Sequence, residues 1–498
     1  MAFISIDLGT TNIKVAIFDD QLRSLVLSSH EVKYDRRGDL VEFDVENYVS
    51  QIAAMIRQIY ANTFPDRQEP IHQIVLTGQA ESLVLVDQTG KPLRPAISWL
   101  DMRSRKECQT IANTFDAEKC YRITGQPEII PTWPITKLLW LREHETSIFK
   151  QAAKYLLLKD YVVHYLTGMF VGEYSIYSFS HYFDLRNKKY WAELLEFADI
   201  PESKLPELVP PCTVVGNIIP KLQQFFGIPG ETKVNIGTLD HFAGMIGTGN
   251  IKEGSVSESA GTVLSIAAFI DRPLASDAKI PIYCGPFPNT YVLLPVCESG
   301  GISLEWFKNN FMPNEDYKRI DAIALERIKA DRVMFLPYIT GVNPPEFNPH
   351  ARGVFFGAKA EHDRYDFCLA IMEGVSFLLR KNIDHLKKAG VHINTIISTG
   401  GGAKSALWSQ LKANISNHTV LIPETEEAPS LGSAIIGAVS EGIFNSYESA
   451  IGHCVKIKKA YQPNEHHAFY EQRFRFFEQL YTALIPLYKQ YTETNILL

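Results

Sequence analysis

Two stretches of the chain repeat one pattern of hydrophobic and polar positions. Residues 3–20 (FISIDLGTTNIKVAIFDD) and residues 255–270 (SVSESAGTVLSIAAFI) each consist of an apolar run, a Gly-Thr pair and a second apolar run. The pattern predicts a β-hairpin whose glycine-containing turn lets a phosphate approach the backbone N–H groups, because no Cβ blocks the way. Either stretch alone is also typical of an ordinary hairpin in a sheet. Two such hairpins indicate two halves that face one polyphosphate.

Periodicity in the rest of the first half predicts strands alternating with helices. Residues 22–34 and 73–79 have the pattern of strands. Residues 44–64 have apolar positions at helical spacing behind a capping Asp44. Residues 102–210 favour mostly helix, and residues 235–249 a strand that runs into a helix.

The second half has the same alternation. Residues 372–390 and 427–444 predict helices, the second with small residues that permit close packing. Residues 393–415 predict a strand, a glycine turn and a helix, and residues 467–491 a long aromatic-rich helix that serves packing. The chain is therefore expected to be an α/β protein.

Its length indicates more than one hydrophobic core. A chain of 498 residues is too long for a single ordinary domain, so we expect two of about 250 residues each. The second hairpin opens the second half, which places the expected domains at residues 1–249 and 250–498.

The net charge and the cysteines limit the kinds of partner and the cellular compartment that we expect. A net charge of −7 argues against a nucleic-acid partner, which usually requires a basic surface. The seven cysteines include no CxxC pair, so we expect reduced thiols in a reducing compartment. No leader peptide is expected at Met1 and no apolar run reaches the ~20 residues of a membrane span. We therefore expect a cytoplasmic protein without a membrane partner.

The first hairpin carries side chains suited to phosphate chemistry. It offers a carboxylate for the metal side, hydroxyl and amide donors, and a cation, at Asp7, Thr10, Thr11, Asn12 and Lys14. Phosphoryl transfer needs all three kinds of group. Neither hairpin contains the GxxxxGK[ST] pattern of a Walker A loop.

Four motifs together resemble the FGGY carbohydrate kinase family, within the superfamily of sugar kinases, Hsp70 and actin. DLGTTNIKVAIFD resembles its first phosphate motif, SAGTVLSI its second, STGGGAKSALWSQLKANI its adenosine motif, and FLPYITGVNPPEFNPHARGVFFG its second signature region. Xylulose-type pentulose kinases are the most similar members. The resemblance implies an α/β fold of two actin-like (ribonuclease H-like) domains with an interdomain catalytic cleft, and ATP and Mg²⁺ as cofactors.

The resemblance assigns the catalytic base to Asp240, in GTLDHFAG. A sugar hydroxyl has too high a pKa to attack alone, so a carboxylate that accepts its proton contributes about 10²–10⁴-fold. The alternative for Asp240 is an ordinary helix N-cap, a role compatible with catalysis. By the same resemblance Asp7 would hold Mg²⁺, and the transferring phosphate would be gripped by Thr10, Thr11, Asn12 and Lys14.

Further residues are implied at the nucleotide. The resemblance places phosphate contacts at Gly261 and Thr262, nearby positions at Gly301 and Glu305, and the adenosine site at Gly400, Gly401, Gly402 and Ser405. A packing turn is the alternative for Gly301, and a solvated helix face for Glu305. A strand-to-helix turn would itself need at least one of the three consecutive glycines.

On the sugar side, SWLDMR resembles the W-x-D-x-R element of the family. Trp99 would supply an apolar wall, and Asp101 and Arg103 acceptors and donors for hydroxyls. The alternative for Asp101 and Arg103 is a structural ion pair, which would still brace the sugar site.

Sequence around the sugar site departs from both well-known subfamilies. Gln79 and Glu81 occupy positions that touch sugar hydroxyls in the family, but xylulose kinases usually have GQMH and glycerol kinases NQRE where this chain has GQAE. His241 would either contact a substrate oxygen or stabilise the Asp240 rotamer. In GVNPPEF, many relatives have an acidic residue and an arginine after the glycine.

These features predict an ATP- and Mg²⁺-dependent kinase that phosphorylates a terminal hydroxyl of a small open-chain sugar, with a ketopentose such as xylulose as first choice. Another ketose, a polyol such as glycerol or erythritol, or a sugar acid are the alternatives within this class. A filament or chaperone ATPase is the alternative from another class, since fold alone does not decide function. Homodimers are common in the family, but nothing in the sequence identifies an interface.

Overall fold

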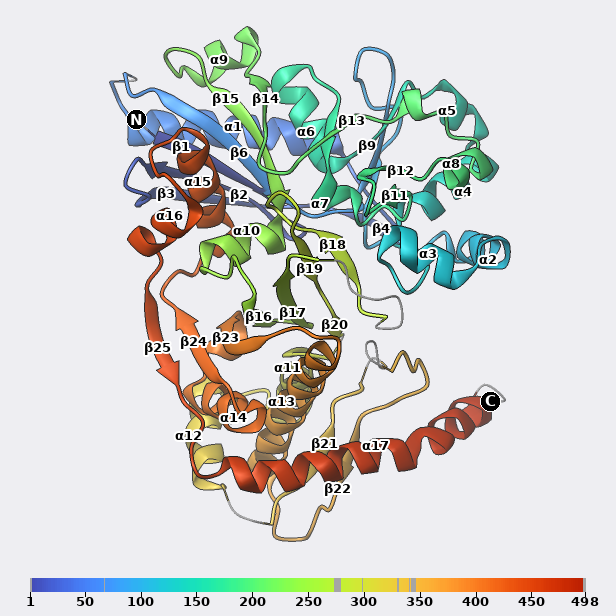
Figure 1. Ribbon diagram of the computed structural model, residues 1–498, viewed down its shortest axis with the longest axis vertical. Coiled ribbons are helices and arrows are strands. Elements are labelled where there is room, and N and C mark those ends of the chain that lie inside the picture. The colour runs from blue at the N-terminus through green and yellow to red at the C-terminus, as the bar shows by residue number, and fades with distance from the viewer. Residues whose placement is uncertain are drawn as a thin grey trace. The chain divides into compact units, whose positions relative to one another are not determined.

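The computed structural model describes residues 2–66, 68–272, 279–297, 299–328, 331–339, 341 and 346–495 (Figure 1). Packing groups them into two compact units. Unit 1 consists of Met1–Ile251, Asp271–Val292 and Thr425–Val455, and unit 2 of Lys252–Ile270, Leu293–Glu424 and Lys456–Leu498. The chain first passes between units next to the predicted boundary at residue 249, but two later segments pack with the first half. The assignment of functions to residues 1–249 and 250–498 stays a prediction.

The main sheet of unit 1 has six strands in the order β14-β15-β6-β1-β2-β3. Strands β1 and β2 form the predicted hairpin, and β1 also pairs in parallel with β6. The strands are β1 (Ala2–Leu8), β2 (Asn12–Asp19), β3 (Ser24–Glu31), β6 (Ile71–Gly78), β14 (Val214–Asn217) and β15 (Lys233–Leu239).

Side chains of β1 alternate between two hydrophobic cores, because successive residues of a strand point to opposite faces. Ile4 and Ile6 belong to a core that contains residues of α1 and α6. Phe3 belongs to a second core that contains residues of α10, α15 and α16. Asp7 has the parity of Phe3, so its side chain is directed to the face that α10 and α15 cover.

Besides this sheet, unit 1 contains helices. The predicted cap of the first helix is confirmed, since the Asp44 side chain accepts from Asn47 N–H at 3.0 Å. The helices are α1 (Val45–Thr63), α2 (Arg105–Thr114), α3 (Ala117–Thr124), α4 (Pro134–His144), α5 (Thr146–Gln151), α6 (Leu158–Thr167), α7 (Tyr174–Tyr177), α8 (Ala192–Phe197), η1 (Glu202–Lys204), α9 (Pro220–Phe226), α10 (Asp240–Gly247), α15 (Ala428–Ser440) and α16 (Tyr447–Cys454).

Shorter strands lie outside the main sheet, and five of them, between residues 154 and 209, interrupt the region 102–210 that the sequence predicts as mostly helical. A five-stranded sheet has the order β4-β5-β8-β7-β9, and β10 pairs with β13 and β11 with β12. Their bounds are β4 (Asp35–Arg37), β5 (Leu40–Phe43), β7 (Leu83–Val86), β8 (Ala96–Ile97), β9 (Lys154–Leu157), β10 (Val171–Glu173), β11 (Phe183–Asp184), β12 (Lys189–Tyr190), β13 (Glu207–Val209), with β18 (Ile282–Cys284) and β19 (Tyr291–Leu293) later in the chain.

Unit 2 repeats the arrangement of unit 1. Strands β16 and β17 form an antiparallel hairpin, β16 pairs in parallel with β23, β23 in parallel with β24, and β24 antiparallel with β25. In unit 1, β1, β2, β6, β15 and β14 have the same sequence of pairings. The predicted duplication is therefore a duplication of sheet topology.

The elements of unit 2 include two long helices. Helix α13 begins at Arg364, eight residues before the predicted start at Met372. The Asp363 side chain caps this start by accepting from Tyr365 N–H. The elements are β16 (Gly254–Ala260), β17 (Leu264–Ile270), β20 (Val296–Cys297), β21 (Met334–Leu336), β22 (Val354–Phe356), β23 (Ile393–Thr399), β24 (Thr419–Pro423), β25 (Ile457–Tyr461), α11 (Ile302–Phe311), α12 (Tyr317–Glu326), α13 (Arg364–Lys388), η3 (Gly401–Lys404), α14 (Ala406–Ser416) and α17 (His467–Asn495).

None of the helices in the described ranges combines the length and hydropathy of a membrane-spanning segment.

Candidate active site

The turn between β1 and β2 is held by its carbonyl groups. Thr10 O accepts from the Tyr34 hydroxyl at 2.8 Å, and Thr11 O accepts from Val32 N–H at 2.8 Å. Gly9 O accepts from Gln79 Nε2 at 3.3 Å. In a trans peptide the N–H points opposite to the carbonyl, so the amides that follow these carbonyls are directed away from the anchors. Amides directed this way suit a bound anion, and the phosphate-binding role of this turn stays a prediction.

The second turn, between β16 and β17, is anchored in the same way. Gly261 O accepts from Gly301 N–H at 2.7 Å, and Thr262 O accepts from Gly300 N–H at 3.2 Å. A Cβ on Gly301 would lie 2.5 Å from Gly261 O, which no neighbour could accommodate without moving. Gly301 is thus a packing residue of this turn, the alternative that the sequence left open. Glu305 is exposed on α11.

The three glycines after β23 lie beside the second turn. A Cβ on Gly400, which has a φ of 77°, would lie 3.0 Å from Ser259 Oγ, and Gly402 is close to Ala260. Gly400 and Gly401 are exposed. Ser405 caps α14 by accepting from Trp408 N–H at 2.9 Å. Unit 2 therefore brings its two glycine motifs together at the ends of neighbouring strands.

In unit 1, a cluster of charged side chains surrounds Asp7. Lys14, opposite Asp7 in the hairpin register, donates from Nζ to Glu427 Oε2 at 2.6 Å. Burial and the nearby charge of Asp240 raise the pKa of Asp7 to about 8, against the influence of Lys14. Among the described residues, no group donates to Asp7 Oδ1 although that atom is buried. A buried carboxylate oxygen without a partner, next to a second carboxylate, suits a hard divalent cation.

Asp240 is the first residue of α10 rather than its N-cap, which is Leu239. Its Oδ1 accepts from the adjacent His241 N–H at 2.6 Å, an amide of the first helical turn, and the side chain of Leu239 forms no cap bond. Burial raises the pKa of Asp240, whereas the His241 amide and the positive charge of Lys159 lower it. The carboxylate is thus partly exposed at a helix N-terminus, where one of its oxygens accepts from a first-turn amide, and its role as base stays a prediction.

The ring of His241 does not bind Asp240. Its backbone amide does, while its Nε2 is buried without a partner among the described residues. Burial lowers the pKa of His241 to about 4, so the imidazole is neutral at neutral pH. The ring remains available to a substrate oxygen.

Trp99 links the sugar-side motif to the phosphate turn. Its Nε1–H donates to Thr10 Oγ1 at 2.8 Å, and its backbone N–H donates to Ser82 Oγ at 3.1 Å. Ser82 in turn donates to Gln79 Oε1 at 2.7 Å. Gln79 and Trp99 are therefore connected through one hydroxyl.

Glu81 is nearly buried, with 8% of its surface exposed, and has a left-handed φ of 70°. Such strain in a residue other than glycine is common at functional sites. Burial raises the pKa of Glu81 to about 7, and the charge of Lys137 opposes the shift. The substrate role of Glu81 stays a prediction, now with strained backbone at its position.

Asp101 and Arg103 form a buried ion pair. Arg103 donates to both carboxylate oxygens of Asp101 at 2.8 Å, and Val41 N–H donates to Asp101 Oδ2 at 2.6 Å. Arg103 also donates to Glu42 at 2.5 Å and lies over the Trp140 ring. The Arg103 backbone N–H also donates to Asp101 Oδ1 at 3.0 Å, and with these four bonds the acceptor capacity of Asp101 is filled. The structure favours the ion-pair alternative, in which the two residues brace the site.

Three side chains of unit 1 are missing from the sequence-based set: Glu427, Lys137 and His181. Glu427 pairs with Lys14, from which it is 413 positions distant in the chain. Lys137 is fully buried with Nζ 2.8 Å from Ser98 O. His181 is buried against Trp133, with neither ring nitrogen partnered among the described residues. A buried lysine near the helix start TWPITK was the one available sequence signal, because lysine rarely sits in an apolar helix face without a partner.

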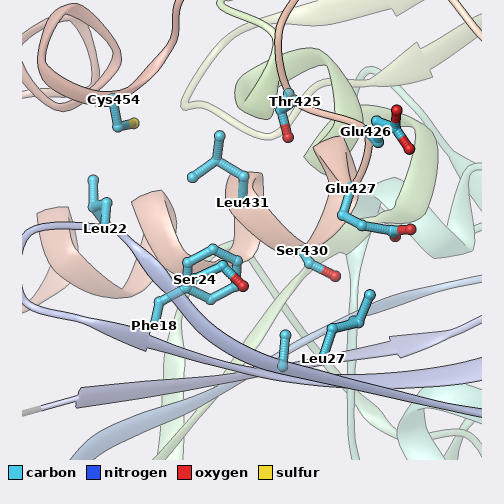
Figure 2. Close-up of a pocket in the computed structure, with 11 residues that line it drawn as sticks. Phe18, Leu22, Ser24, Leu27, Thr425, Glu426, Glu427, Ser430, Leu431 and Cys454 are labelled. Carbon is cyan, nitrogen blue, oxygen red and sulfur yellow. The ribbon is translucent and has the colours of Figure 1, made fainter.

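A pocket of about 300 Å³ lies elsewhere in unit 1 (Figure 2). In Figure 2, Phe18 and Leu27 of the sheet face Leu431 and Ser430 of α15. None of the predicted site residues lines it. The lining residues are Ala16, Phe18, Leu22, Ser24, Leu27, Thr425, Glu426, Glu427, Ser430, Leu431 and Cys454.

The duplicated sheet topology, the two anchored glycine turns and the carboxylate pair define a sugar-kinase-like phosphotransferase. Sequence models of the FGGY family of carbohydrate kinases match residues 2–247 with the N-terminal domain and residues 259–441 with the C-terminal domain. The chain belongs to this family, and it is an ATP-dependent phosphotransferase with the two-domain α/β fold that the sequence predicts.

Proteins similar to this chain include xylulose kinases and gluconokinases. The chain is 32% identical to a xylulose kinase of Staphylococcus epidermidis, with 96% of each chain covered. It is 28% identical to a gluconokinase of Bacillus subtilis, with 90% of this chain and 89% of the relative covered. The ligand-bound xylulose kinase structure from Lactobacillus acidophilus superposes with a TM-score of 0.90 at 25% identity, covering 98% of this chain and 99% of that one.

Proposed function

We propose that this enzyme transfers the γ-phosphate of ATP to a terminal hydroxyl of a neutral open-chain sugar, with a ketopentose such as xylulose as the first candidate. The observation that carries the proposal is Asp240, a partly exposed carboxylate at the start of α10 that lies within electrostatic reach of Asp7. A carboxylate in that position can bond a first-turn amide through one oxygen and accept a proton at the other. The two relatives named above phosphorylate sugars or sugar acids, as their names state.

Asp240 acts as the general base. Its carboxylate accepts the proton of the sugar hydroxyl as the hydroxyl oxygen forms a bond to the γ-phosphorus. The bond between the γ-phosphorus and its bridging oxygen then breaks, and ADP departs with that oxygen. The raised pKa of Asp240 strengthens it as a base, since proton affinity rises with pKa.

The first turn and Lys14 hold the transferring phosphate. Thr10, Thr11 and Asn12 present backbone amides away from the anchored carbonyls, and Lys14 exchanges Glu427 for phosphate oxygens. Asp7 would hold Mg²⁺, which when bound supplies charge neutralisation to the phosphates. The buried Oδ1 of Asp7, which has no partner within the part of the chain that the structure describes, is a feature that fits such an ion.

Unit 2 supplies the nucleotide side. The exposed turn at Gly261 and Thr262 contacts the β- and γ-phosphates, and the exposed Gly400 and Gly401 leave room for adenosine against the backbone. These two motifs lie at the ends of the paired strands β16 and β23, so one extended ligand reaches both. Glu305 stays at the periphery, on an exposed helix face.

Glu81 argues for a neutral sugar over an aldonate. Its carboxylate is a buried acidic group of the sugar side, and Lys137 is the cation opposite it. A substrate carboxylate would compete with Glu81 for that one cation, which disfavours two charged carboxylates in the same buried region. Gln79, Trp99 and His241 offer hydroxyl partners and an apolar wall instead.

A substrate panel tests the proposal. The purified enzyme is assayed for ADP formation with ATP and D-xylulose, L-ribulose, D-fructose, glycerol, erythritol or D-gluconate. We expect the highest kcat/KM with a ketopentose and weak ATP hydrolysis without sugar, because the site excludes water during transfer. Preference for gluconate would instead assign Lys137 to the substrate carboxylate. Equal ADP formation with and without every sugar would overturn the proposal.

A further inference from the structure

A buried polar chain in unit 1 leads to the backbone next to Asp240. Lys159 on α6 donates from Nζ to Glu173 Oε1 at 2.6 Å, and both side chains are fully buried. Glu173 also accepts from the Ser175 hydroxyl at 2.7 Å. A buried ion pair without further hydrogen bonds would be costly, so this pair is part of a larger arrangement.

The Ser175 hydroxyl is the junction of that arrangement. It donates its proton to Glu173, and its oxygen accepts from Leu239 N–H at 3.1 Å. Its oxygen also lies 2.9 Å from Thr238 Oγ1, whose hydroxyl must be the donor because the Ser175 proton is already used. The hydroxyl of Ser175 therefore makes every hydrogen bond that a serine can make.

Leu239 is the N-cap of α10 and the residue before Asp240. Its N–H donates to Ser175 Oγ, and because the first amides of a helix lie outside the helical bond pattern, this bond satisfies a donor that the helix itself does not use. The backbone at Thr238 is fixed from the other side as well, since Thr77 Oγ1 donates to Thr238 O at 3.0 Å. Movement at Ser175 is thus transmitted directly to the Cα of Asp240.

We propose that Ser175, held by the Lys159–Glu173 pair, is a positioning residue that sets where the Asp240 carboxylate meets the sugar hydroxyl. This proposal rests on the proposed function, since it acts through the base assigned there. The neighbouring charged and titratable groups around Asp240 are Lys159, Asp7, His241 and Tyr48, with Lys14 and Glu427 beyond Asp7. None of these replaces the Ser175 contact to the Leu239 amide.

Unit 2 contains a matched control built from the same residue types. Lys412 donates to Glu258 at 2.8 and 2.9 Å, and the buried Ser398 hydroxyl donates to the same carboxylate. This second Lys-Glu-Ser group contributes no bond to α10. Ser398→Ala therefore removes a comparable buried hydroxyl without the proposed effect.

A double-mutant cycle tests the proposal. Ser175→Ala is measured in the native enzyme and in Asp240→Asn, with ketopentose and ATP saturating. A displacement of the base by a fraction of an ångström should lower kcat about tenfold or more. In Asp240→Asn, where no base remains to be positioned, the same substitution should change the residual rate by less than about twofold. Ser398→Ala should have equal effects in both backgrounds.

As a control, the fraction of folded enzyme is measured by calorimetry as the ATP-binding stoichiometry, because partial unfolding would lower kcat without displacing the base. Full stoichiometry with reduced kcat supports positioning. Equal losses from Ser175→Ala in the two backgrounds, or an unchanged kcat, would overturn it. Should Ser175→Ala not fold, Ser175→Cys, of similar size but a weak acceptor, takes its place in the cycle. If the native enzyme phosphorylates no sugar, the proposed function fails; if it does and Asp240→Asn abolishes turnover, only the positioning claim is at stake.

Discussion

Helices α10 and α15 touch through their backbones, and this contact predicts a strong effect of one methyl group. A Cβ placed on Gly432 of α15 would lie 1.8 Å from the Ala243 carbonyl oxygen of α10. Ala243 is one helical turn after Asp240. Gly432→Ala therefore forces apart the two helices that carry Asp240 and Glu427 at their starts.

The displacement follows from the contact distance. A Cβ essentially never lies closer than 3.0 Å to a non-bonded atom, so the helices must separate by about 1 Å or distort locally, as expected for an overpacked core. Overpacking of this kind costs about 1–3 kcal/mol of unfolding free energy. Misplacing a catalytic group by 1 Å costs about 10²-fold in rate, so kcat should fall by up to this factor.

Urea unfolding and steady-state kinetics measure both effects. Gly452→Ala in α16 is the matched control, since a Cβ there meets no atom within 4 Å and alanine improves helix propensity by up to about 1 kcal/mol. Gly452→Ala should keep native kcat and equal or higher stability. Native kcat together with native stability in Gly432→Ala would refute the reasoning from close helix contact.

Three further predictions concern single side chains. Trp99→Phe keeps the apolar wall but removes the indole hydrogen bond to Thr10. A lost bond worth about 1 kcal/mol should raise the KM for ATP roughly fivefold. An unchanged KM would contradict a link between Trp99 and the phosphate turn. Asp101→Asn should lower the free energy of unfolding by about 3–5 kcal/mol in urea, because it breaks a buried ion pair; native stability with a raised sugar KM would instead support direct sugar contact. Since catalysis needs the Asp240 carboxylate and burial raises its pKa, kcat/KM should fall with decreasing pH through a pKa above the usual 3.8, and a flat profile down to that value would contradict the shift.

Sequence reasoning reached the local features of the fold and site. The hairpins, the helix cap at Asp44 and the strand that leads into the helix at Asp240 each depend on neighbouring residues, so periodicity and turn chemistry predict them. The parity of Asp7 on β1 was equally available, since it follows from alternation along one strand.

The contacts that sequence reasoning missed join distant parts of the chain. Lys14 pairs with Glu427, which belongs to a segment of the second half that packs in unit 1, and no local sequence pattern predicts that packing.

The roles of Asp101 and Arg103 depend on the fold for another reason. These residues lie two positions apart, a spacing equally consistent with sugar contact and with mutual pairing. Which of these holds depends on burial against Glu42 and Trp140, which only the folded chain specifies.

The most direct test of the central claim compares the native enzyme with Asp240→Asn. Phosphorylated sugar is measured with a ketopentose at saturating ATP, and ATP affinity is measured by calorimetry. Asparagine is nearly isosteric but accepts no proton, so we predict native ATP affinity with turnover reduced about 10²–10⁴-fold. Turnover of Asp240→Asn close to the native rate would contradict the assignment of Asp240 as the base that activates the sugar hydroxyl.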